Sequence, residues 1–310
     1  MAIQKLLRIS DLNLSQIENL MQRALDLRLQ IEKNPNEDIF VKSLRQSPVG
    51  LIFLEPSTRT RVSFERACHL TQRKTVLLSG KDTSFEKGES LSDAVMNLKA
   101  LGVYDFIIRT YDTGGLEILR GMSDIGVING GDGVGEHPTQ ALLDCLTILR
   151  FCVSGKSKDL KNLKGFRLGL VGDLRRSRVA QSWSALAEVL GIEIELFSPP
   201  AWAPQNWGSK WKHRAELSPS MKDLNALMVF RVQTERTPDS TQHHVTLDEL
   251  NAVQVSLKSL KDDQFVLHPG PVNWGVELRE DVREDKRTLI LEQVKSGLAL
   301  RSVLISELGA

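Results

Sequence analysis

A run of side chains that can bind an anion follows the apolar residues 49–54. The five consecutive residues are Ser57, Thr58, Arg59, Thr60 and Arg61. A helix is expected to begin near Ser63, so the free amides at its N-terminus would add partial positive charge to the hydroxyl and guanidinium donors. The tract therefore predicts a phosphate site. The alternative is an ordinary N-cap with solvated arginines, which is what a single Ser or Thr before a helix usually is.

Further polar side chains follow other short apolar runs along the chain. Arg109 follows the run at residues 106–108, and His137 and Gln140 follow the run at residues 126–128. In the second half of the chain, polar tracts that follow apolar runs contain Asp173, Arg178, Arg231, Gln233 and His268. Ligands bind beyond the carboxyl ends of parallel strands, so these ends predict one cleft between two sheets. In isolation, His137 could be a helix cap and Arg109 could pair with a surface carboxylate.

Other chemistries are disfavoured by the spacing of their motifs. The glycines within residues 130–135 lack the spacing of a dinucleotide loop, and residues 155–157 lack a P-loop because Arg150 stands at its first glycine. His243 and His244 lack partner ligands, so no metal site is predicted. No Gly-x-Ser-x-Gly elbow occurs. The chemistry is therefore expected to depend on positioning and electrostatics and not on a covalent nucleophile.

Length and composition indicate the class of protein. The chain has 310 residues, 41% hydrophobic and 25% charged, which suits a soluble globular protein of two domains. A formal net charge of +1 with scattered basic residues argues against nucleic acid as a partner. Three unpaired cysteines, and the lack of an apolar segment of membrane-spanning length or a signal peptide, predict a cytoplasmic protein without membrane attachment.

Apolar runs alternate with helical patterns along the chain, which predicts an α/β fold of two domains, each a parallel sheet flanked by helices. The expected strands are residues 49–54, 75–78, 106–108, 126–128, 168–171, 193–197, 227–230 and 265–267. A first helix capped by Ser10 or Asp11 and a last helix over residues 291–308 are also expected. The predicted domains are residues 1–150 plus 290–310, and residues 151–289. Residues 198–211 are expected to form a long surface loop.

The motifs together resemble the aspartate carbamoyltransferases, within the aspartate/ornithine carbamoyltransferase family, over nearly the whole chain. The resemblance is carried, in chain order, by residues 53–65, 87–89, 131–133, 137–144, 172–178, 231–236 and 268–273. It implies transfer of a carbamoyl group from carbamoyl phosphate to the amine of L-aspartate in pyrimidine synthesis. It implies no cofactor and no metal. It makes the first domain the carbamoyl-phosphate-binding domain and the second the aspartate-binding domain, with the active site in the cleft between them.

The resemblance also assigns roles to individual residues. The phosphate is bound by Ser57, Thr58, Arg59 and Thr60. The carbamoyl carbonyl is polarised by Thr60, Arg109 and His137, while Gln140 holds the carbamoyl amide and the backbone of Pro269 and Gly270 contacts its nitrogen. The aspartate carboxylates are bound by Arg178, Arg231 and Gln233. Ser84 and Lys87 are implied to enter from the adjacent subunit, in a homotrimer with shared active sites, although residues 83–90 taken alone suggest an exposed loop.

Two positions depart from the family pattern. Thr110 stands where the family usually has histidine, and Trp274 stands where many relatives have arginine. Alternatives are an ornithine or other amino-acid carbamoyltransferase and a non-catalytic relative that acts as an assembly scaffold. The tract beginning His268-Pro269-Gly270-Pro271 argues against the ornithine enzyme, which generally has His-Cys-Leu-Pro there. The resemblance leaves room for a separate regulatory chain or a dihydroorotase partner.

Overall fold

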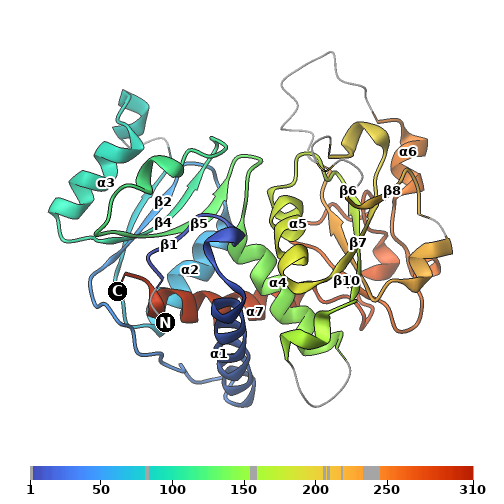
Figure 1. Cartoon of the computed structure of the whole chain (residues 1–310), viewed down its shortest axis with the longest axis horizontal. Coiled ribbons are helices and arrows are strands. Elements are labelled where there is room, and N and C mark those ends of the chain that lie inside the picture. The colour runs from blue at the N-terminus through green and yellow to red at the C-terminus, as the bar shows by residue number, and fades with distance from the viewer. Residues whose placement is uncertain are drawn as a thin grey trace. The chain divides into compact units, whose positions relative to one another are not determined.

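The chain forms two structural units in a computed structural model (Figure 1). The structure describes residues 3–80, 84–153, 159–204, 207, 210–217, 219–232 and 245–309. Unit 1 comprises Met1–Leu146 and Val294–Ala310, and unit 2 comprises Thr147–Gln293. The division falls within two helices, α4 (Pro138–Phe151) and α7 (Ile290–Glu307).

Unit 1 contains a five-stranded sheet in the order β1-β5-β4-β2-β3, and every pairing in it is parallel. In chain order its strands are β1 (Lys5–Leu6), β2 (Val49–Phe53), β3 (Thr75–Ser79), β4 (Asp105–Thr110) and β5 (Gly126–Asp132). The strands β2, β4 and β5 are largely buried, as expected for strands covered on both faces. By contrast, β3 at one edge has no fully buried residue.

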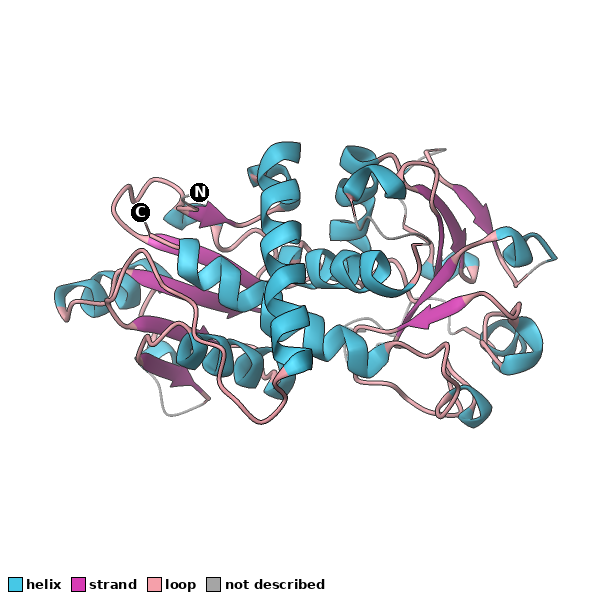
Figure 2. Ribbon diagram, turned by 90° about the horizontal axis from the view of Figure 1, so that it is seen from below, coloured by secondary structure: helices cyan, strands magenta, loops and turns pink. Residues whose placement is uncertain are grey.

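Unit 2 contains a second parallel sheet in the order β10-β9-β6-β7-β8. Its strands are β6 (Arg167–Gly172), β7 (Glu193–Phe197), β8 (Lys212–Arg214), β9 (Ala226–Phe230) and β10 (Phe265–Leu267). Helices pack against the strands of each sheet (Figure 2). The predicted α/β class with two parallel sheets is therefore confirmed.

The helices bury the apolar stripes that their sequences contain. In unit 1 these helices are α1 (Leu14–Lys33), α2 (Thr58–Leu70) and α3 (Leu91–Ala100). Val95 and Leu98 of α3 pack in one core cluster with Ile52, Phe106 and Ile108 of the sheet. In unit 2, α5 (Arg178–Leu190) buries Trp183 completely, and the short α6 (Leu247–Ala252) has no buried residue. Among the described residues, no helix has both the length and the apolar character needed to span a bilayer.

Several local expectations were wrong. Helix α2 begins at Thr58, five positions before the expected start near Ser63, so the hydroxyl and guanidinium side chains lie within its first turn. Asn13, and not Ser10 or Asp11, caps α1, because its side chain accepts from the amide of Gln16 and Gln16 bonds back in a capping box. Strands β1 and β8 and helix α6 were not predicted, since each has too few residues to show a period.

The described part of the Trp-rich tract at residues 198–211 contains a 3-10 helix, Pro200–Trp202, and its side chains are not all at the surface, as the expected surface loop would have them. Trp202 and Trp207 are buried. The indole Nε1 of Trp207 donates to Gln181 Oε1 at 2.9 Å, and that of Trp211 donates to Ser184 Oγ at 3.2 Å. These two indole hydrogen bonds therefore hold the tract against helix α5.

Candidate active site

The order of strands places the predicted site residues at one point in each sheet. In unit 1, the connection that leaves β2 runs to β3 on one side and the connection that leaves the adjacent β4 runs to β5 on the other, so the direction changes between β2 and β4. In unit 2, β6 connects on to β7 on one side and the adjacent β9 connects on to β10 on the other, so the direction changes between β6 and β9. Open α/β sheets bind ligands beyond the carboxyl ends of strands at such switch points. The turn at Ser57 follows β2 and Arg109 is the last residue but one of β4, while Asp173 follows β6 and Arg231 follows β9.

The carboxyl end of β2 leads into the N-terminus of α2. Ser57 is the N-cap residue, but its side chain makes no capping hydrogen bond. Thr58 and Arg59 are exposed and Thr60 is buried, with 6% of its surface exposed. Since the first amides of a helix have no partner within the helix, this turn combines backbone donors, hydroxyls and the guanidinium group of Arg59. The arrangement fits a phosphate group.

Arg109 is held at the end of β4 by a carboxylate and a backbone carbonyl. Its Nη2 donates to Glu55 Oε1 at 2.8 Å and its Nη1 donates to Gly130 O at 3.2 Å. The side chains of Arg109 and Glu55 are only 11% and 12% exposed. An arginine bonded on two sides keeps a fixed orientation, as a group that stabilises developing charge must. The pairing of Arg109 is thus with a largely buried carboxylate, and not with a surface one.

The glycine-rich segment after β5 is organised around Asp132. The amide of Glu136 donates to Asp132 Oδ1 at 2.6 Å, and the amide of Gly114 donates to Asp132 Oδ2 at 2.9 Å. Asn129 Nδ2 also donates to Asp132 Oδ1, at 3.1 Å. Gly133 has φ +46°, and a Cβ there would lie 2.5 Å from the carbonyl oxygen of Tyr111. The segment therefore forms a tight turn that leads directly into His137.

His137 and Gln140 stand at the start of α4, as the sequence predicted. Both are buried, with 4% and 8% of their surface exposed. The carbonyl of His137 accepts the amide of Gln140 at 2.9 Å, and Thr139 Oγ1 lies 3.5 Å from His137 Nδ1. The leucine stripe of this helix, Leu142, Leu143, Leu146 and Leu149, is fully buried and fixes which face the two polar residues occupy.

In unit 2, the switch point carries Arg178 at the start of α5. Gly172 ends β6 with φ +107°, and a Cβ there would lie 2.6 Å from the carbonyl oxygen of Phe230 on the neighbouring strand. Ser177 caps α5 by accepting the amide of Ala180 at 3.2 Å. Arg178 is 5% exposed at the positive end of this helix, and Arg231, beyond β9, is half-buried. Two guanidinium groups are suited to a ligand with carboxylates.

His268 fixes the loop that contains Pro269 and Gly270. Its Nδ1 accepts the amide of Gly270 at 2.8 Å, so Nε2 carries the proton and donates to Glu277 Oε1 at 3.2 Å. Glu277 Oε1 also accepts the amide of Asn273 at 2.6 Å. His268 and Glu277 are buried, and Pro269 and Gly270 are half-buried. The loop backbone is thereby held in one conformation after β10.

Some predicted site residues are not brought together by the described structure. Lys87 is exposed in a short 3-10 helix, Ser84–Lys87, after β3. The side chain of Ser84 and the whole of Gln233 lie outside the described residues. The two residues that depart from the family pattern, Thr110 and Trp274, each make a contact within their own unit. Thr110 is buried, and its Oγ1 accepts the amide of Asp112 at 3.2 Å, while the ring of Trp274 lies 5.4 Å from the guanidinium carbon of Arg283.

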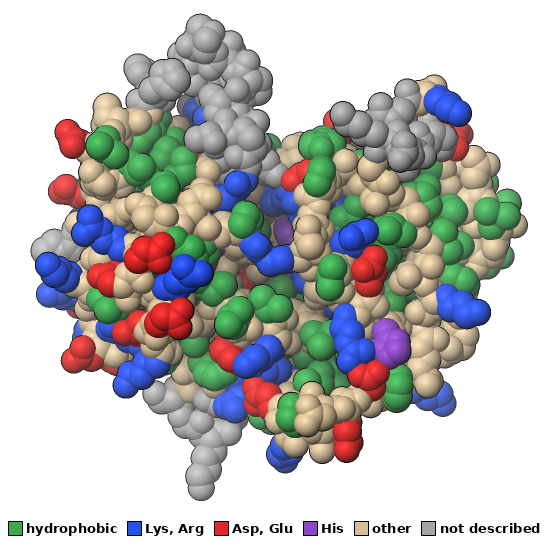
Figure 3. Space-filling view, turned by 180° about the vertical axis from the view of Figure 1, so that it is seen from behind, with side chains coloured by type: hydrophobic (Ala, Val, Ile, Leu, Met, Phe, Trp, Pro, Cys, Tyr) green, Lys and Arg blue, Asp and Glu red, His purple; other side chains and the backbone are tan. Residues whose placement is uncertain are grey.

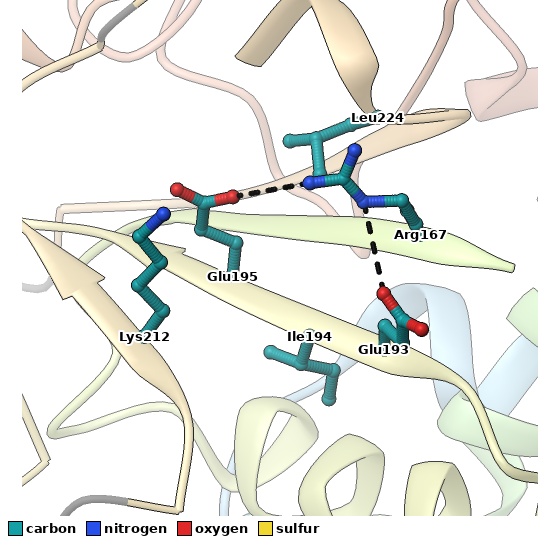
Figure 4. Close-up of a pocket in the computed structure, with 6 residues that line it drawn as sticks. All are labelled: Arg167, Glu193, Ile194, Glu195, Lys212 and Leu224. Atoms are coloured by element: carbon teal, nitrogen blue, oxygen red, sulfur yellow. Dashed lines mark ion pairs between the residues drawn. The ribbon is translucent and has the colours of Figure 1, made fainter. Parts of the chain in front are cut away.

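A hollow of about 140 Å³ in unit 2 is lined by charged side chains at the opposite edge of the sheet (Figure 4). Arg167 and Glu193 are the first residues of β6 and β7, so the hollow lies at the amino ends of the strands. Arg167 lies 3.8 Å from carboxylate oxygens of Glu193, Glu195 and Asp223. The positive charge of Arg167 is therefore already matched by carboxylates, and the hollow does not lie at the switch point of the sheet.

The two buried cysteines are unsuited to act as nucleophiles, and the described part of the chain shows no metal site. Burial raises the pKa of the Cys68 thiol to about 12 and raises that of Cys145 further, so neither forms a thiolate near neutral pH. No group of three or more His, Cys, Asp or Glu is placed to hold a metal ion among the described residues. On the face shown in Figure 3, basic side chains are interspersed with acidic ones.

The sequence interpretation gave no role to six buried polar residues in and around the site, although three of them lie within the motifs that carry the resemblance. They are Glu55, Asn129, Asp132, Asp144, Glu277 and Arg301. A carboxylate directly after a buried strand was a usable signal for Glu55, and Asp132 was marked by the glycines on either side. Arg301 gave no such signal, because it lies more than 150 residues from Asp144, the carboxylate that acts on it electrostatically.

Two parallel α/β units with basic side chains at their switch points are typical of enzymes that act on anionic substrates. The family model for the aspartate/ornithine carbamoyltransferase carbamoyl-P binding domain matches residues 4–150, and the model for the Asp/Orn binding domain matches residues 164–308. The chain belongs to the aspartate/ornithine carbamoyltransferase family.

Individual relatives match over nearly the whole chain. The aspartate carbamoyltransferase catalytic subunit of Desulforudis audaxviator is 34% identical over 312 residues, covering 98% of this chain and 97% of the relative. That of Thermus thermophilus is 35% identical over 298 residues, covering 95% and 94%. A solved aspartate transcarbamoylase from Trypanosoma cruzi, in complex with carbamoyl phosphate, has a TM-score of 0.83 at 24% identity and covers 100% of this chain and 97% of its own. At that identity the structural likeness supports the fold.

Proposed function

We propose that the chain catalyses transfer of the carbamoyl group from carbamoyl phosphate to the amine of L-aspartate, giving N-carbamoyl-L-aspartate and phosphate, in pyrimidine synthesis. The observation that carries the proposal is the coincidence of both switch points with the basic residues predicted for the two substrates. The names of the relatives, aspartate carbamoyltransferase catalytic subunits, agree with it.

Unit 1 is proposed to bind carbamoyl phosphate. Its phosphate would accept hydrogen bonds from the first amides of α2 and from Ser57, Thr58, Arg59 and Thr60. Arg109, His137 and Thr60 would stabilise the oxyanion that forms when the amine attacks the carbamoyl carbon. Gln140 would bind the carbamoyl amide. Fixed donors of this kind suit a reaction whose nucleophile is the substrate's own amine.

Unit 2 is proposed to bind aspartate. Arg178 lies at the N-terminus of α5 and Arg231 beyond the adjacent β9, so neighbouring strands carry the guanidinium groups needed for two carboxylates. Gln233 is proposed as a third ligand. The backbone of Pro269 and Gly270, held by His268, would contact the carbamoyl nitrogen. Orienting two substrates in this way removes much of the entropic part of the barrier.

The proposal is tested by supplying the purified chain with carbamoyl phosphate and either L-aspartate or L-ornithine. We expect carbamoylaspartate and phosphate to form in equal amounts, with no citrulline. Formation of citrulline alone would indicate an ornithine enzyme. Absence of both products from a folded chain would instead support a non-catalytic scaffold.

A homotrimer with shared active sites is proposed from the edge strand β3. This strand is at the open edge of the unit 1 sheet, and Leu77 within it is 40% exposed. An exposed edge strand with an apolar side chain is a common site of association. The segment that contains Ser84 and Lys87 follows β3 after a few residues, so a contact at this edge would bring it near a neighbouring subunit.

Replacing Leu77 by a charged residue should separate the subunits. In Leu77→Glu we expect sedimentation velocity to show monomer where the unaltered chain shows trimer, because a carboxylate would be buried without a partner at the contact. Activity should fall with it, since Ser84 and Lys87 would no longer be supplied. The control is Ile118→Glu, which changes a side chain that is 64% exposed in the same unit but away from β3. A trimeric Leu77→Glu chain would contradict this location of the interface.

A cytoplasmic location and association with a separate regulatory chain or dihydroorotase partner stay predictions. Sedimentation of the chain together with a candidate partner would test the second of them.

A further inference from the structure

Gln140 is bonded within unit 1 to a carboxylate one helical turn away. Its Nε2 donates to Asp144 Oδ1 at 2.9 Å, and Asp144 is completely buried. An ionised carboxylate only accepts hydrogen bonds, so the NH₂ of Gln140 must face Asp144. The other end of the same amide, Oε1, is then the group that Gln140 presents to a ligand, and it is an acceptor.

Asp144 also acts on an arginine from a distant part of the chain. Arg301, on α7, is 4% exposed, and burial lowers its pKa to about 10, while the Asp144 carboxylate acts to raise it and the Arg109 guanidinium acts to lower it. The guanidinium carbon of Arg301 lies 4.8 Å from the centre of the Phe64 ring on α2. Arg301 therefore packs against α2, and the Asp144 carboxylate on α4 acts on its guanidinium group electrostatically.

The burial of this cluster distinguishes it from an ordinary helix pair. Gln and Asp four residues apart often pair on the exposed face of a helix, with a small gain in stability. Here both side chains are buried, and a buried carboxylate is costly unless it is compensated. The carboxylate is best explained by a task that an apolar residue could not perform, which is to fix the orientation of the Gln140 amide.

We propose that Asp144 is a positioning residue that turns Gln140 so that its Oε1 accepts a hydrogen bond from the carbamoyl NH₂ group, and that Arg301 stabilises Asp144 in this task. The inference rests on the proposed function, because it takes Gln140 as the ligand of the carbamoyl amide. It adds a reason for selectivity: an acceptor at this place favours a carbamoyl group over an acyl group that has no N–H to donate.

A double-mutant cycle of Asp144→Asn and Gln140→Ala tests the proposal. An asparagine can accept from the Gln140 NH₂ or donate to its Oε1, so the amide would be free to turn over. For Asp144→Asn we expect the KM for carbamoyl phosphate to rise about tenfold while kcat changes less than about threefold, because a ground-state contact is lost. In the Gln140→Ala background, the same substitution should change this KM by less than about twofold.

The matched control is Asp105→Asn. Asp105 is an equally buried aspartate of unit 1 that pairs with Arg45 and Arg73 at the amino end of β4. The Asp105→Asn chain should lose thermal stability without a change in its KM for carbamoyl phosphate.

The possible outcomes separate clearly. An undiminished effect of Asp144→Asn in the Gln140→Ala background would overturn the proposal, and so would a loss of stability with an unchanged KM. If Asp144→Asn does not fold, Arg301→Lys replaces it in the cycle, since it keeps the charge and weakens the support. Arg301→Lys should raise the KM for carbamoyl phosphate by a smaller factor than the tenfold expected for Asp144→Asn, and only when Gln140 is present. An unaltered chain that forms no carbamoylaspartate would contradict the proposed function itself.

Discussion

Arg59→Ala is expected to lower kcat for carbamoylaspartate formation by about 10³-fold, the largest effect of any single change in unit 1. Arg59 lies in the first turn of α2, where the backbone amides and hydroxyls can hold a phosphate but supply no full positive charge. The leaving phosphate gains negative charge in the transition state, and losing one fixed charged donor there costs about 10²–10³-fold or more. Steady-state kinetics at saturating aspartate measure this loss.

The control for Arg59→Ala is Arg66→Ala on the same helix. Arg66 pairs with Asp38 at the surface, and its side chain is 43% exposed. An exposed pair contributes little, so kcat should change less than about twofold. Arg59→Lys should restore activity only in part, because an ammonium group supplies charge without the planar fork of donors. A kcat in Arg59→Ala close to that of Arg66→Ala would show that Arg59 does not contact the transferred group.

Arg231→Ala is expected to have the largest effect in unit 2, with kcat/KM for aspartate falling about 10²-fold or more. Arg231 follows the end of β9 at the switch point of its sheet and is half-buried. A charge-assisted pair with a substrate carboxylate is worth about 1.5–3 kcal/mol, and more when its loss leaves the carboxylate without a partner. The loss should be concentrated in the KM for aspartate, with the KM for carbamoyl phosphate little changed.

Arg167→Ala is the matched control, because it removes an arginine from the opposite edge of the same sheet. Arg167 is the first residue of β6, and its carboxylate neighbours all lie at 3.8 Å. Kinetic constants for both substrates should stay within about twofold of the unaltered chain. Equal losses in Arg167→Ala and Arg231→Ala would mean that the fold of unit 2, and not a substrate contact, responds to these substitutions.

Much of the fold could be predicted because buried parallel strands are visible as apolar runs. The expected strands at residues 193–197 and 265–267 agree residue for residue with β7 and β10. Errors were concentrated at short or polar elements. The start of α2 was placed too late, since Thr and Arg in its first turn resemble loop residues until the cap geometry at Ser57 is seen. The two-residue β1 is defined only by its pairing with β5.

Site residues also differ in whether their role can be predicted from neighbouring positions in the chain or depends on distant ones. The side chains that would contact substrate stand directly after strands or at helix starts, so their types and spacing marked them. The groups that hold them are less visible, because their roles depend on partners elsewhere. Glu55 acquires its role from Arg109, which lies 54 residues away in the chain.

The sequence by itself determined the α/β class, the family and the residues with anion-binding side chains, because hydrophobic period and motif spacing are properties of neighbouring positions. Only the tertiary structure decided that β2 adjoins β4 and that β6 adjoins β9, which is what puts the Ser57 turn beside Arg109 and Asp173 beside Arg231. Strand order depends on how whole helices and strands pack, with contacts between residues far apart in the chain. The tertiary structure likewise brought Arg301 of the last helix against the Phe64 ring of α2, a contact between residues more than 200 positions apart that no local pattern can specify.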